Sequence, residues 1–429
     1  MRLLYSSLLI PIAIGISSFA FAQTWEPLGT GITSWDTNEL PVYTLCEYNG
    51  KLYAGGTFHN AGKLKTNYIA SWDGKQWDTL SIGTNGIVTA MAVYKNALCV
   101  GGGFSKAGRK KANNVAEWVD TTRTIPAWHI LGNGIAPMGG LDDKSKPDLS
   151  LYGYVIYALT GYKEELYATG NFTESGDGTR KNFIAKWNGY KWNKVGKPLY
   201  RNGIDYNGAD SVGGGVGDDY SIAASAVLGN ELYVSLGNNS TVPRIEKNNI
   251  YKWDGNKWQA AATGLTNMNK VVEDARIYTM AVYDSELYVA GSIALADGKR
   301  AHNIAKWDGK SWSVLGDGMG STVREMVPFD GTVRSMVVYN GKLYVGGVFD
   351  SAGGKPAKSI ACWDGHNWSA VGAGLSTGKY PSVANVNALC VYKGELYAGG
   401  SFTSSGGKTV MNIARLNLNG TKSSTKSKK

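Results

Sequence analysis

The chain has 429 residues, of which 57 are Gly, 25 Tyr, 14 Trp and 9 Phe, and 18% are charged. This composition excludes a disordered chain and a coiled coil, which are both poor in aromatic residues. Abundant Gly and aromatic side chains with only 11 Pro favour many short strands joined by tight turns, so the sequence predicts an all-β protein. The formal net charge of +10 indicates solubility or weak attraction to polyanions, and no nucleic-acid partner is expected.

The first 22 residues have the pattern of a secretory signal peptide. Arg2 precedes an apolar run over residues 3–16, and Ala20 and Ala22 stand at the two positions that signal peptidase reads. We expect cleavage before Gln23 and export of the chain, so that it is secreted, held at the cell surface or periplasmic. No later stretch is apolar enough for a transmembrane segment, and the sequence predicts no lipid anchor.

A repeated unit occupies the sequence after the signal peptide. It is clearest over residues 333–374, where two apolar strands joined by a tight turn are followed by a polar loop and two strands that each carry a Trp. The second strand of each unit begins with Leu, at Leu52, Leu98, Leu166, Leu232, Leu287, Leu343 and Leu396. From this Leu to the third-strand Trp the separation is 20 or 21 residues in six copies, and Leu416 replaces the Trp in the seventh. The length of the period therefore varies only in the links between units.

The turns of each unit predict four antiparallel strands. Asp-Gly or Asn-Gly pairs stand between two Trp five residues apart, which is a hairpin signal because these residues accept positive φ. The pairs are Asp73-Gly74, Asn188-Gly189, Asp254-Gly255, Asp308-Gly309 and Asp364-Gly365. A single four-stranded sheet cannot bury both its faces, so we expect seven sheets to pack radially as a seven-bladed β-propeller.

Each end of the chain supplies what the other lacks. The seventh unit stops after Leu416 without a fourth strand, whereas residues 25–31 have the pattern of a fourth strand with nothing before them. We predict that this N-terminal strand completes the last blade and closes the ring. The predicted organisation is a signal peptide over residues 1–22, one propeller domain over residues 23–419, and a basic disordered tail over residues 420–429. We expect a monomer.

The repeat resembles that of the kelch-type β-propellers, including the central propeller of galactose oxidase. The resemblance covers nearly all of residues 24–420 and rests on the third-strand aromatic residue, the Trp that opens the fourth strand, and a Gly pair on the second strand. The Gly pair occurs at Gly55-Gly56, Gly101-Gly102, Gly346-Gly347 and Gly399-Gly400. The third strand has Trp-Asp-Gly where the family has Tyr-Asp, and the fourth unit has Ser235-Leu236 in place of the Gly pair. The pattern also resembles repeats of exported bacterial proteins.

One position varies at the start of the innermost strand, while the residues around it stay apolar or small. Its residues are Tyr43, Thr89, Tyr157, Ala223, Tyr278, Arg334 and Asn387. We expect this position near the mouth of the central channel, where Tyr rings stack on sugars and Arg pairs with carboxylate or sulfate groups. The candidate ligand-binding residues are therefore Tyr43, Tyr157, Tyr278, Arg334 and Asn387. Packing between neighbouring blades explains the Tyr residues almost as well.

Basic residues recur in the loop between the second and third strands of every unit. They are Lys63, Lys65, Lys106, Arg109, Lys110, Lys111, Arg180, Lys181, Arg244, Lys247, Lys299, Arg300, Lys355, Lys358 and Lys408. The short turns are expected to leave one face smooth, so recognition should lie on the opposite, loop-rich face. One interpretation is a positive ring that attracts an anionic glycan, with contacts from Lys110, Lys111, Arg180, Lys181 and Arg300. The other is a solvated turn in which Lys keeps sheet edges soluble.

Two long links carry acidic residues of the kind that an enzyme would need. They run over residues 133–154 and 197–220 and contain Asp142, Asp143, Asp148, Asp205, Asp210, Asp218 and Asp219. These carboxylates suit a bound cation or the paired acids of glycan chemistry. Neither link has the spacing of a calcium loop, and ordinary solvated acids explain them more simply.

The cysteine and histidine residues form no recognisable metal or catalytic pattern. They are Cys46, Cys99, Cys362 and Cys390, and His59, His129, His302 and His366. The cysteines fall at apolar repeat positions, which predicts core residues, and Cys46 and Cys390 are equivalent in the first and last units, which leaves a disulfide open. Because the histidines are not equivalent, copper chemistry of the galactose-oxidase type is not expected. We predict no metal, no cofactor and no catalytic residue.

These patterns together predict an exported, non-enzymatic binding or scaffold propeller that engages a glycan or an extracellular protein through its loop-rich face. The basic loops favour an anionic glycan. Two alternatives stay open: a polysaccharide-acting lyase or hydrolase that uses the loop carboxylates, and a structural surface protein. Fold alone does not choose among them, because propellers serve many functions.

Overall fold

The computed structural model describes residues 23–34, 42–120, 125–136, 156–172, 174–175, 183–197, 199–200, 203–204, 220–238, 248–266, 275–321, 331–378 and 384–418. These residues form strands and turns and contain no helix, so the prediction of an all-β protein is confirmed. None of them belongs to a helix long and apolar enough to cross a membrane. The expected signal peptide, the basic tail and most of the two acidic links lie outside the described residues.

Seven four-stranded antiparallel sheets make up the body of the described chain. We number them 1–7 in chain order and give their strands from the inner strand outward. Sheet 1 contains β3 (Val42–Tyr48), β4 (Lys51–Gly56), β7 (Ile69–Trp72) and β8 (Trp77–Thr79). Sheet 2 contains β9 (Ile87–Tyr94), β10 (Ala97–Gly103), β13 (Val115–Val119) and β14 (Ala127–Ile130). Sheet 3 contains β16 (Ile156–Tyr162), β17 (Glu165–Gly170), β19 (Ile184–Trp187) and β20 (Trp192–Lys194).

The remaining sheets have the same order of strands. Sheet 4 contains β23 (Tyr220–Leu228), β24 (Glu231–Asn238), β25 (Asn248–Trp253) and β26 (Trp258–Thr263). Sheet 5 contains β28 (Arg276–Tyr283), β29 (Glu286–Ser292), β32 (Ile304–Trp307) and β33 (Trp312–Val314). Sheet 6 contains β35 (Thr332–Tyr339), β36 (Lys342–Val348), β39 (Ile360–Trp363) and β40 (Trp368–Ala370). Sheet 7 contains β41 (Asn385–Tyr392), β42 (Glu395–Ser401), β45 (Ile413–Asn417) and, from the N-terminal end of the chain, β1 (Thr24–Pro27).

Short strands in the loops between second and third strands form small hairpins. They are β5 (Asn60–Ala61) with β6 (Leu64–Lys65), β11 (Lys106–Ala107) with β12 (Lys110–Lys111), β30 (Leu295–Ala296) with β31 (Lys299–Arg300), β37 (Ser351–Ala352) with β38 (Lys355–Pro356), and β43 (Ser404–Ser405) with β44 (Lys408–Thr409). Link strands β2 (Ile32–Thr33), β27 (Leu265–Thr266) and β34 (Met319–Gly320) pair with the hairpins of the sheets that follow them, and β15 (Ile135–Ala136) pairs with β18 (Glu174–Ser175). A further hairpin joins β21 (Leu199–Tyr200) and β22 (Gly203–Ile204).

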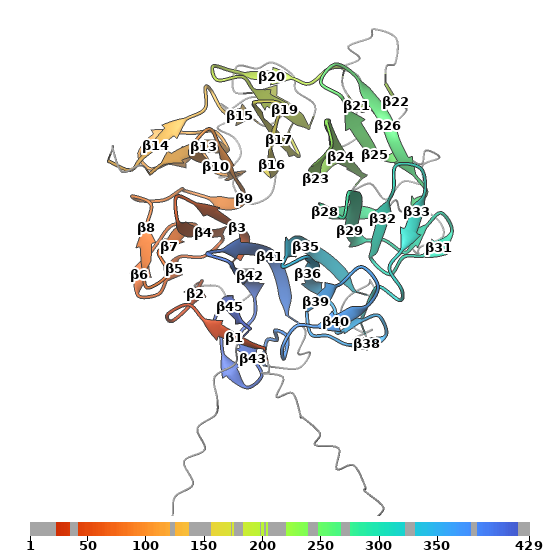
Figure 1. The fold of residues 1–429 in the computed structure, drawn as a ribbon. Helices are drawn as coiled ribbons and strands as arrows, with labels where there is room; N and C mark the ends of the chain where they lie inside the picture. Colours follow the sequence, from red (N-terminus) through yellow and green to blue (C-terminus); the bar gives the residue numbers. More distant parts are fainter. Residues whose placement is uncertain are drawn as a thin grey trace, which may run out of the picture.

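The sheets are arranged around a common centre, with their inner strands nearest to it (Figure 1). Each inner strand contacts the inner strand of the next sheet, and β41 of sheet 7 contacts β3 of sheet 1. Seven clusters of buried apolar side chains form the core of the described residues, and each cluster joins two neighbouring sheets. The hydrophobic core therefore lies between the sheets, as the two-sided burial of each sheet requires.

A tryptophan that opens the outer strand links each sheet to the preceding one. Its indole N–H donates to a backbone carbonyl just after the preceding sheet's outer strand or at its end. The bonds are Trp77 to Leu28 (3.1 Å), Trp128 to Leu80 (3.0 Å), Trp192 to Leu131 (3.0 Å), Trp258 to Val195 (2.9 Å), Trp312 to Thr263 (2.7 Å), Trp368 to Leu315 (2.7 Å) and Trp25 to Val371 (3.2 Å). Because Leu28 follows β1, the first bond joins sheet 1 to sheet 7.

A second series of bonds starts at the last residue of the inner strand. In six sheets this residue is Tyr, and its hydroxyl donates to a backbone carbonyl in or beside the first turn of the next sheet. The bonds are Tyr48 to Asn96, Tyr94 to Glu164, Tyr162 to Asn230, Tyr283 to Gly341, Tyr339 to Gly394 and Tyr392 to Gly50, at 2.6–3.0 Å. Sheet 4 has Leu228 there. The two series together hold both the inner and the outer strands in place.

The N-terminal strand is the outer strand of the sheet that contains the C-terminal repeat. β1 pairs with β45 over four residues, with Trp25 opposite Leu416, and Figure 1 shows the two strands side by side. Trp25 is 1% exposed. Glu26 accepts hydrogen bonds from Asn417 at 2.7 Å and from Arg415 at 2.6 Å. Burial and charge therefore both attach the two ends of the chain to each other.

Replacing the buried indole of β1 should destabilise the whole protein. We expect Trp25→Ala to lower the free energy of unfolding by about 3–5 kcal/mol, the usual cost of removing a buried Trp. Denaturant unfolding of the chain from Gln23 onward measures the change. Leu418→Ala, which shortens a side chain that is 37% exposed next to β45, is the control and should change stability by less than about 0.5 kcal/mol. Equal stability of Trp25→Ala and the parent would contradict this role of β1.

The same attachment should weaken in acid. The Asn417 hydrogen bond, together with Arg415, holds the pKa of Glu26 below its ordinary value. A carboxylate with a lowered folded pKa stabilises the protein above its unfolded pKa of about 4.3, and this contribution disappears as the pH falls through the folded pKa. Glu26→Gln should therefore be less stable than the parent at pH 7, and the difference should shrink towards pH 3. A difference that does not change with pH, measured by thermal melting, would contradict the assignment.

Candidate functional site

Each inner strand carries one extra residue relative to its neighbour, a β-bulge near the start of the strand. In six sheets the register between inner and second strand skips Tyr43, Thr89, Tyr157, Tyr278, Arg334 and Asn387. In sheet 4, Ala223 and Ala224 together face the single residue Ser235. The variable position of the repeat is therefore the bulge. A bulge turns its side chain out of the strand's in-and-out alternation. The residue at the bulge therefore does not have to be one that fits the apolar core.

In sheets 1, 2, 6 and 7 the Gly pair of the second strand lies opposite the bulge and accommodates it, whereas sheets 3 and 5 keep only the second Gly, at Gly170 and Gly291. In sheet 6 a Cβ at Gly347 would collide with the backbone oxygen of Thr332, which lies just before the bulge. A Cβ at Gly346 would collide with the Val386 side chain of sheet 7. One Gly therefore accommodates the bulge, and the other allows the next sheet to approach.

Sheet 4 achieves the same geometry without the Gly pair. The Ser235 hydroxyl accepts a hydrogen bond from the Ala224 N–H at 3.0 Å and lies 3.4 Å from the Ala224 carbonyl, to which it donates. Ser235 is 1% exposed. The side chain thus satisfies the backbone groups that the irregular pairing leaves without partners. This substitution preserves the frame of the repeat.

Two bulged side chains connect neighbouring sheets. Asn387 of sheet 7 donates its amide N–H to the Val42 carbonyl of sheet 1 at 2.9 Å. Thr89 of sheet 2 donates its hydroxyl to the Ile156 carbonyl of sheet 3. In both cases the acceptor belongs to the residue just before the next sheet's bulge. Thr89 and Asn387 therefore each connect their own sheet to the next one.

Arg334 and Tyr278 form the most distinctive pair at the bulge positions. The guanidinium carbon of Arg334 in sheet 6 lies 4.3 Å from the centre of the Tyr278 ring in sheet 5. The Arg334 Nε is buried and finds no hydrogen-bond partner among the described residues. Stacking on an aromatic ring holds the guanidinium plane in one orientation. The arrangement can therefore present a fixed cation to an anionic group.

The other two candidate tyrosines are half-buried at the same level. Burial raises the pKa of Tyr157, so its phenol remains a neutral hydrogen-bond donor and acceptor. Tyr43 is likewise half-buried at the bulge of sheet 1. With Arg334 and Tyr278, these residues surround the centre of the molecule at the start of the inner strands.

The basic loop residues lie at a different radius. Lys110, Lys111 and Arg300 are exposed on the small hairpins, and hairpin strands such as β6, β12 and β38 contact the outer strands of their sheets. Figure 1 shows β6, β31 and β38 at the periphery. The structure therefore separates these cations from the bulge residues, which lie on the inner strands. Arg180 and Lys181 lie outside the described residues.

The remaining candidates contribute little to a described site. The acidic residues of the two long links lie outside the described residues. No group of three or more His, Cys, Asp or Glu that could hold a metal ion occurs in the described part of the chain. All four cysteines are free thiols, with Cys99 and Cys362 buried and Cys46 and Cys390 half-buried. The structure therefore pairs neither Cys46 nor Cys390.

The sequence analysis missed one feature on the face of the molecule that carries the short turns, because that face was expected to be smooth. A groove of about 700 Å³ opens there between sheets 2 and 3 and contains Glu117. A signal for it was present in the repeat, since Glu117 stands where sheets 3, 4 and 5 have Lys. The comparison of equivalent charged positions would have found this exception.

One family model that matches the chain agrees with the arrangement of the sheets. The family described as "Domain of unknown function (DUF5122) beta-propeller" matches residues 394–424. A solved structure titled "Structure of YjhT" is similar at 14% sequence identity and a TM-score of 0.42, covering 82% of this chain and 99% of that chain. No curated protein matches the sequence. The family match and the radially arranged four-stranded sheets support a β-propeller.

Filling the space opposite a bulge should be costly. We expect Gly347→Ala to lower the free energy of unfolding by about 1–3 kcal/mol, because the new methyl group collides with backbone. Gly161→Ala is the matched control in inner strand β16, since no atom lies within 4 Å of a Cβ there. This control should be neutral or slightly stabilising. Equal unfolding curves for the two variants would show that the bulge does not constrain the second strand.

Proposed function

We propose that this chain is a closed, seven-bladed, kelch-type propeller that acts as an exported binding protein. The two series of hydrogen bonds and the apolar clusters between sheets support closure, because each of them includes a link between sheet 7 and sheet 1. The signal-peptide pattern before Gln23 supports export. A rigid ring of this kind presents side chains from several blades to one ligand without moving the backbone.

The proposed ligand is a glycan that carries carboxylate or sulfate groups. The observation that carries this proposal is the Arg334–Tyr278 pair, in which the ring orients a guanidinium whose Nε has no partner among the described residues. Because stacking orients the half-buried guanidinium, an anionic oxygen would pair with its terminal nitrogens in a strong, charge-assisted hydrogen bond. Tyr43 and Tyr157 would supply ring faces for stacking on sugars.

The peripheral cations have a different part in this proposal. The hairpins place Lys111 and Arg300 in solvent, where salt screens each charge strongly. Lys110 is exposed along its side chain, and its ammonium group donates to the Trp128 carbonyl at 2.7 Å. Exposed cations around a binding face raise the rate of encounter with a polyanion more than they raise affinity. They would attract the chain of the glycan, and Arg334 would bind one of its anionic groups.

Binding to an array of anionic and neutral polysaccharides tests the proposal. The protein is produced in a host that exports it, and N-terminal sequencing is expected to read Gln23 as the first residue. We expect retention on uronic-acid or sulfated glycans at low salt, lost as salt rises. Arg334→Gln should weaken binding by about tenfold or more, as expected when a charge-assisted hydrogen bond is removed.

Lys75→Gln is the matched control for this substitution. It removes the same charge from an exposed side chain in the turn between β7 and β8 of sheet 1. This turn lies at the end of sheet 1 opposite to its bulge, so the substitution should leave binding almost unchanged. Equal weakening by both substitutions would show a nonspecific charge effect and contradict a site at Arg334. Equal retention of neutral glycans would contradict an anionic ligand. Release of reducing ends from a retained glycan would contradict a non-enzymatic role.

A further inference from the structure

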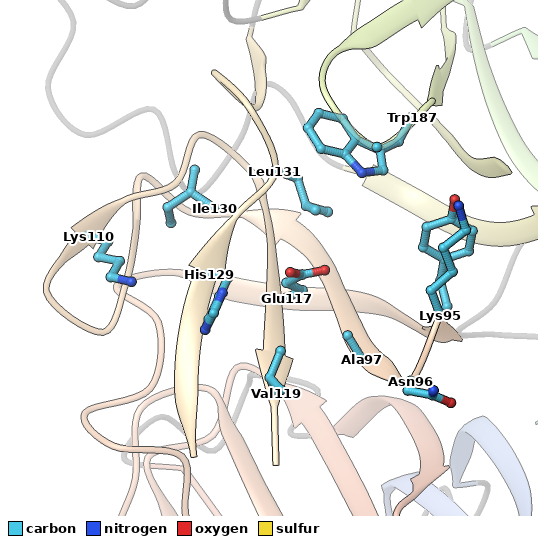
Figure 2. A pocket seen from close by; sticks show the side chains of 12 residues that line it. Lys95, Asn96, Ala97, Lys110, Glu117, Val119, His129, Ile130, Leu131 and Trp187 are labelled. Carbon is cyan, nitrogen blue, oxygen red and sulfur yellow. The ribbon is translucent and has the colours of Figure 1, made fainter. Parts of the chain in front are cut away.

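The groove between sheets 2 and 3 combines a carboxylate with an apolar wall. Its lining includes Ala97, Leu131 and Trp187, one carboxylate at Glu117, and the basic residues Lys95, Lys110 and His129. Figure 2 shows the Glu117 carboxylate between Leu131 and Ala97, with the Trp187 indole and the Lys95 side chain across the open space. The volume of about 700 Å³ is large enough for a long side chain of another molecule. This groove is separate from the bulge residues on the inner strands.

In sheets 3, 4 and 5 the equivalent region contains an ion pair between Glu and Lys. In sheet 3, Lys186 lies 2.9 Å from Glu165; in sheet 4, Lys252 lies 2.9 Å from Glu231; in sheet 5, Lys306 lies 2.6 Å from Glu286. In each pair the Glu begins the second strand and the Lys precedes the third-strand Trp. Arg415 and Glu395 form the same pair in sheet 7 at 3.3 Å. The repeat therefore places a carboxylate and a cation together at this point.

Sheet 2 has a carboxylate at the position of the cation and Ala at the position of the carboxylate. Glu117 occupies the third-strand position, and Ala97 occupies the second-strand position. Glu117 is half-buried, and the described residues give it no ion pair; its cross-strand neighbour is His129. Burial raises the pKa of Glu117, with His129 acting in the opposite direction. A carboxylate in this position gains from any cation that enters the groove, because burial has removed part of its hydration.

The rim of the groove has an exposed aromatic side chain. Tyr190 follows the groove residue Gly189 in the turn between β19 and β20 and is 87% exposed. The corresponding turn residues in sheets 1, 4, 5 and 6 are Lys75, Asn256, Lys310 and His366. An aromatic residue in solvent beside a hollow is typical of a protein-binding surface, where Tyr provides contact area at low entropic cost.

We propose that this groove binds a lysine side chain presented by a partner protein. The ammonium group would pair with Glu117, and the alkyl stem would pack on Leu131 and Trp187. The ligand thus supplies the amine and the stem that Lys186, Lys252 and Lys306 supply within their own sheets. Tyr190 contacts the partner's backbone or side chains next to that lysine.

Peptide binding tests this site directly. The probe is the acetylated, amidated pentapeptide Gly-Leu-Lys-Leu-Gly, and its comparison replaces Lys with norleucine, which keeps the stem and removes the ammonium group. Isothermal titration calorimetry at low salt should detect the Lys peptide at an affinity of about millimolar or tighter, in the range of a few contacts. The norleucine peptide should bind at least about tenfold more weakly, since it lacks the charge-assisted hydrogen bond.

Two substitutions remove the site in different ways. Glu117→Gln keeps the shape and should weaken Lys-peptide binding about tenfold or more. Ala97→Lys supplies an internal lysine for Glu117, so it should abolish binding and leave the melting temperature equal or higher. Glu231→Gln is the matched control, because that carboxylate is already paired with Lys252, and it should bind the peptide like the parent. If Ala97→Lys does not fold, Glu117→Gln still decides the outcome.

A third substitution distinguishes a protein partner from a free amine. Tyr190→Ser should weaken binding of the peptide several-fold and leave binding of 1,5-diaminopentane unchanged. Equal affinity for the diamine and the peptide would overturn a protein partner. Unchanged peptide binding by Glu117→Gln, or no binding of the Lys peptide to the parent, would overturn the site itself. None of these results depends on glycan binding at Arg334.

Discussion

The hydrogen bond from each outer-strand indole to the preceding sheet is the contact on which the rest of the structure depends. A four-stranded sheet with two apolar faces has no stable existence alone, so its neighbours must be held at a fixed distance and angle. The seven indoles do this at the outer strands, where sheets that radiate from one centre are farthest apart. Because a buried N–H is stabilised by an acceptor, each bond also fixes the position of a backbone carbonyl in the preceding sheet.

At the inner strands, where the sheets approach one another most closely, the bulges accommodate the packing that the indole bonds impose. Sheets that approach one another closely near the centre leave little room for side chains, and in sheets 1, 2, 6 and 7 the second strand has Gly where the next sheet touches it. The extra residue of each inner strand takes its side chain out of the packed alternation. This explains how a frame repeated seven times can have Tyr, Thr, Ala, Arg and Asn at one position. The frame is constant because its side chains form the core between the sheets, whereas the bulge lies outside that alternation and accepts residues of different size and charge.

The second unusual region arises from a missing contact. In sheets 3, 4 and 5 a Glu–Lys pair neutralises two charges and fills the space beside the third strand. Sheet 2 has Ala97 and Glu117 there. Within this sheet Glu117 therefore has no ion-pair partner among the described residues, and the short Ala97 side chain leaves the space beside the third strand open. Between sheets 1 and 2 the corresponding hollow, about 220 Å³, includes Lys51 and Asp120, which pair at 2.8 Å. Departures from a repeat therefore indicate function more directly than the repeated residues do.

The sequence by itself determined the strand content of each repeat, the Asp-Gly and Asn-Gly turns, and the partner of the N-terminal strand. These features depend on local periodicity and on which strand each end lacks, and both can be read from residue spacing. It also singled out Arg334 and Tyr278 as members of a variable position. Only the tertiary structure decided that this position is a bulge, that Arg334 lies over Tyr278, and that Lys110 and Arg300 lie far out on hairpins. The physical reason is that spacing records neighbours along a strand, whereas radius, stacking and an unfilled hollow depend on how separate sheets approach one another.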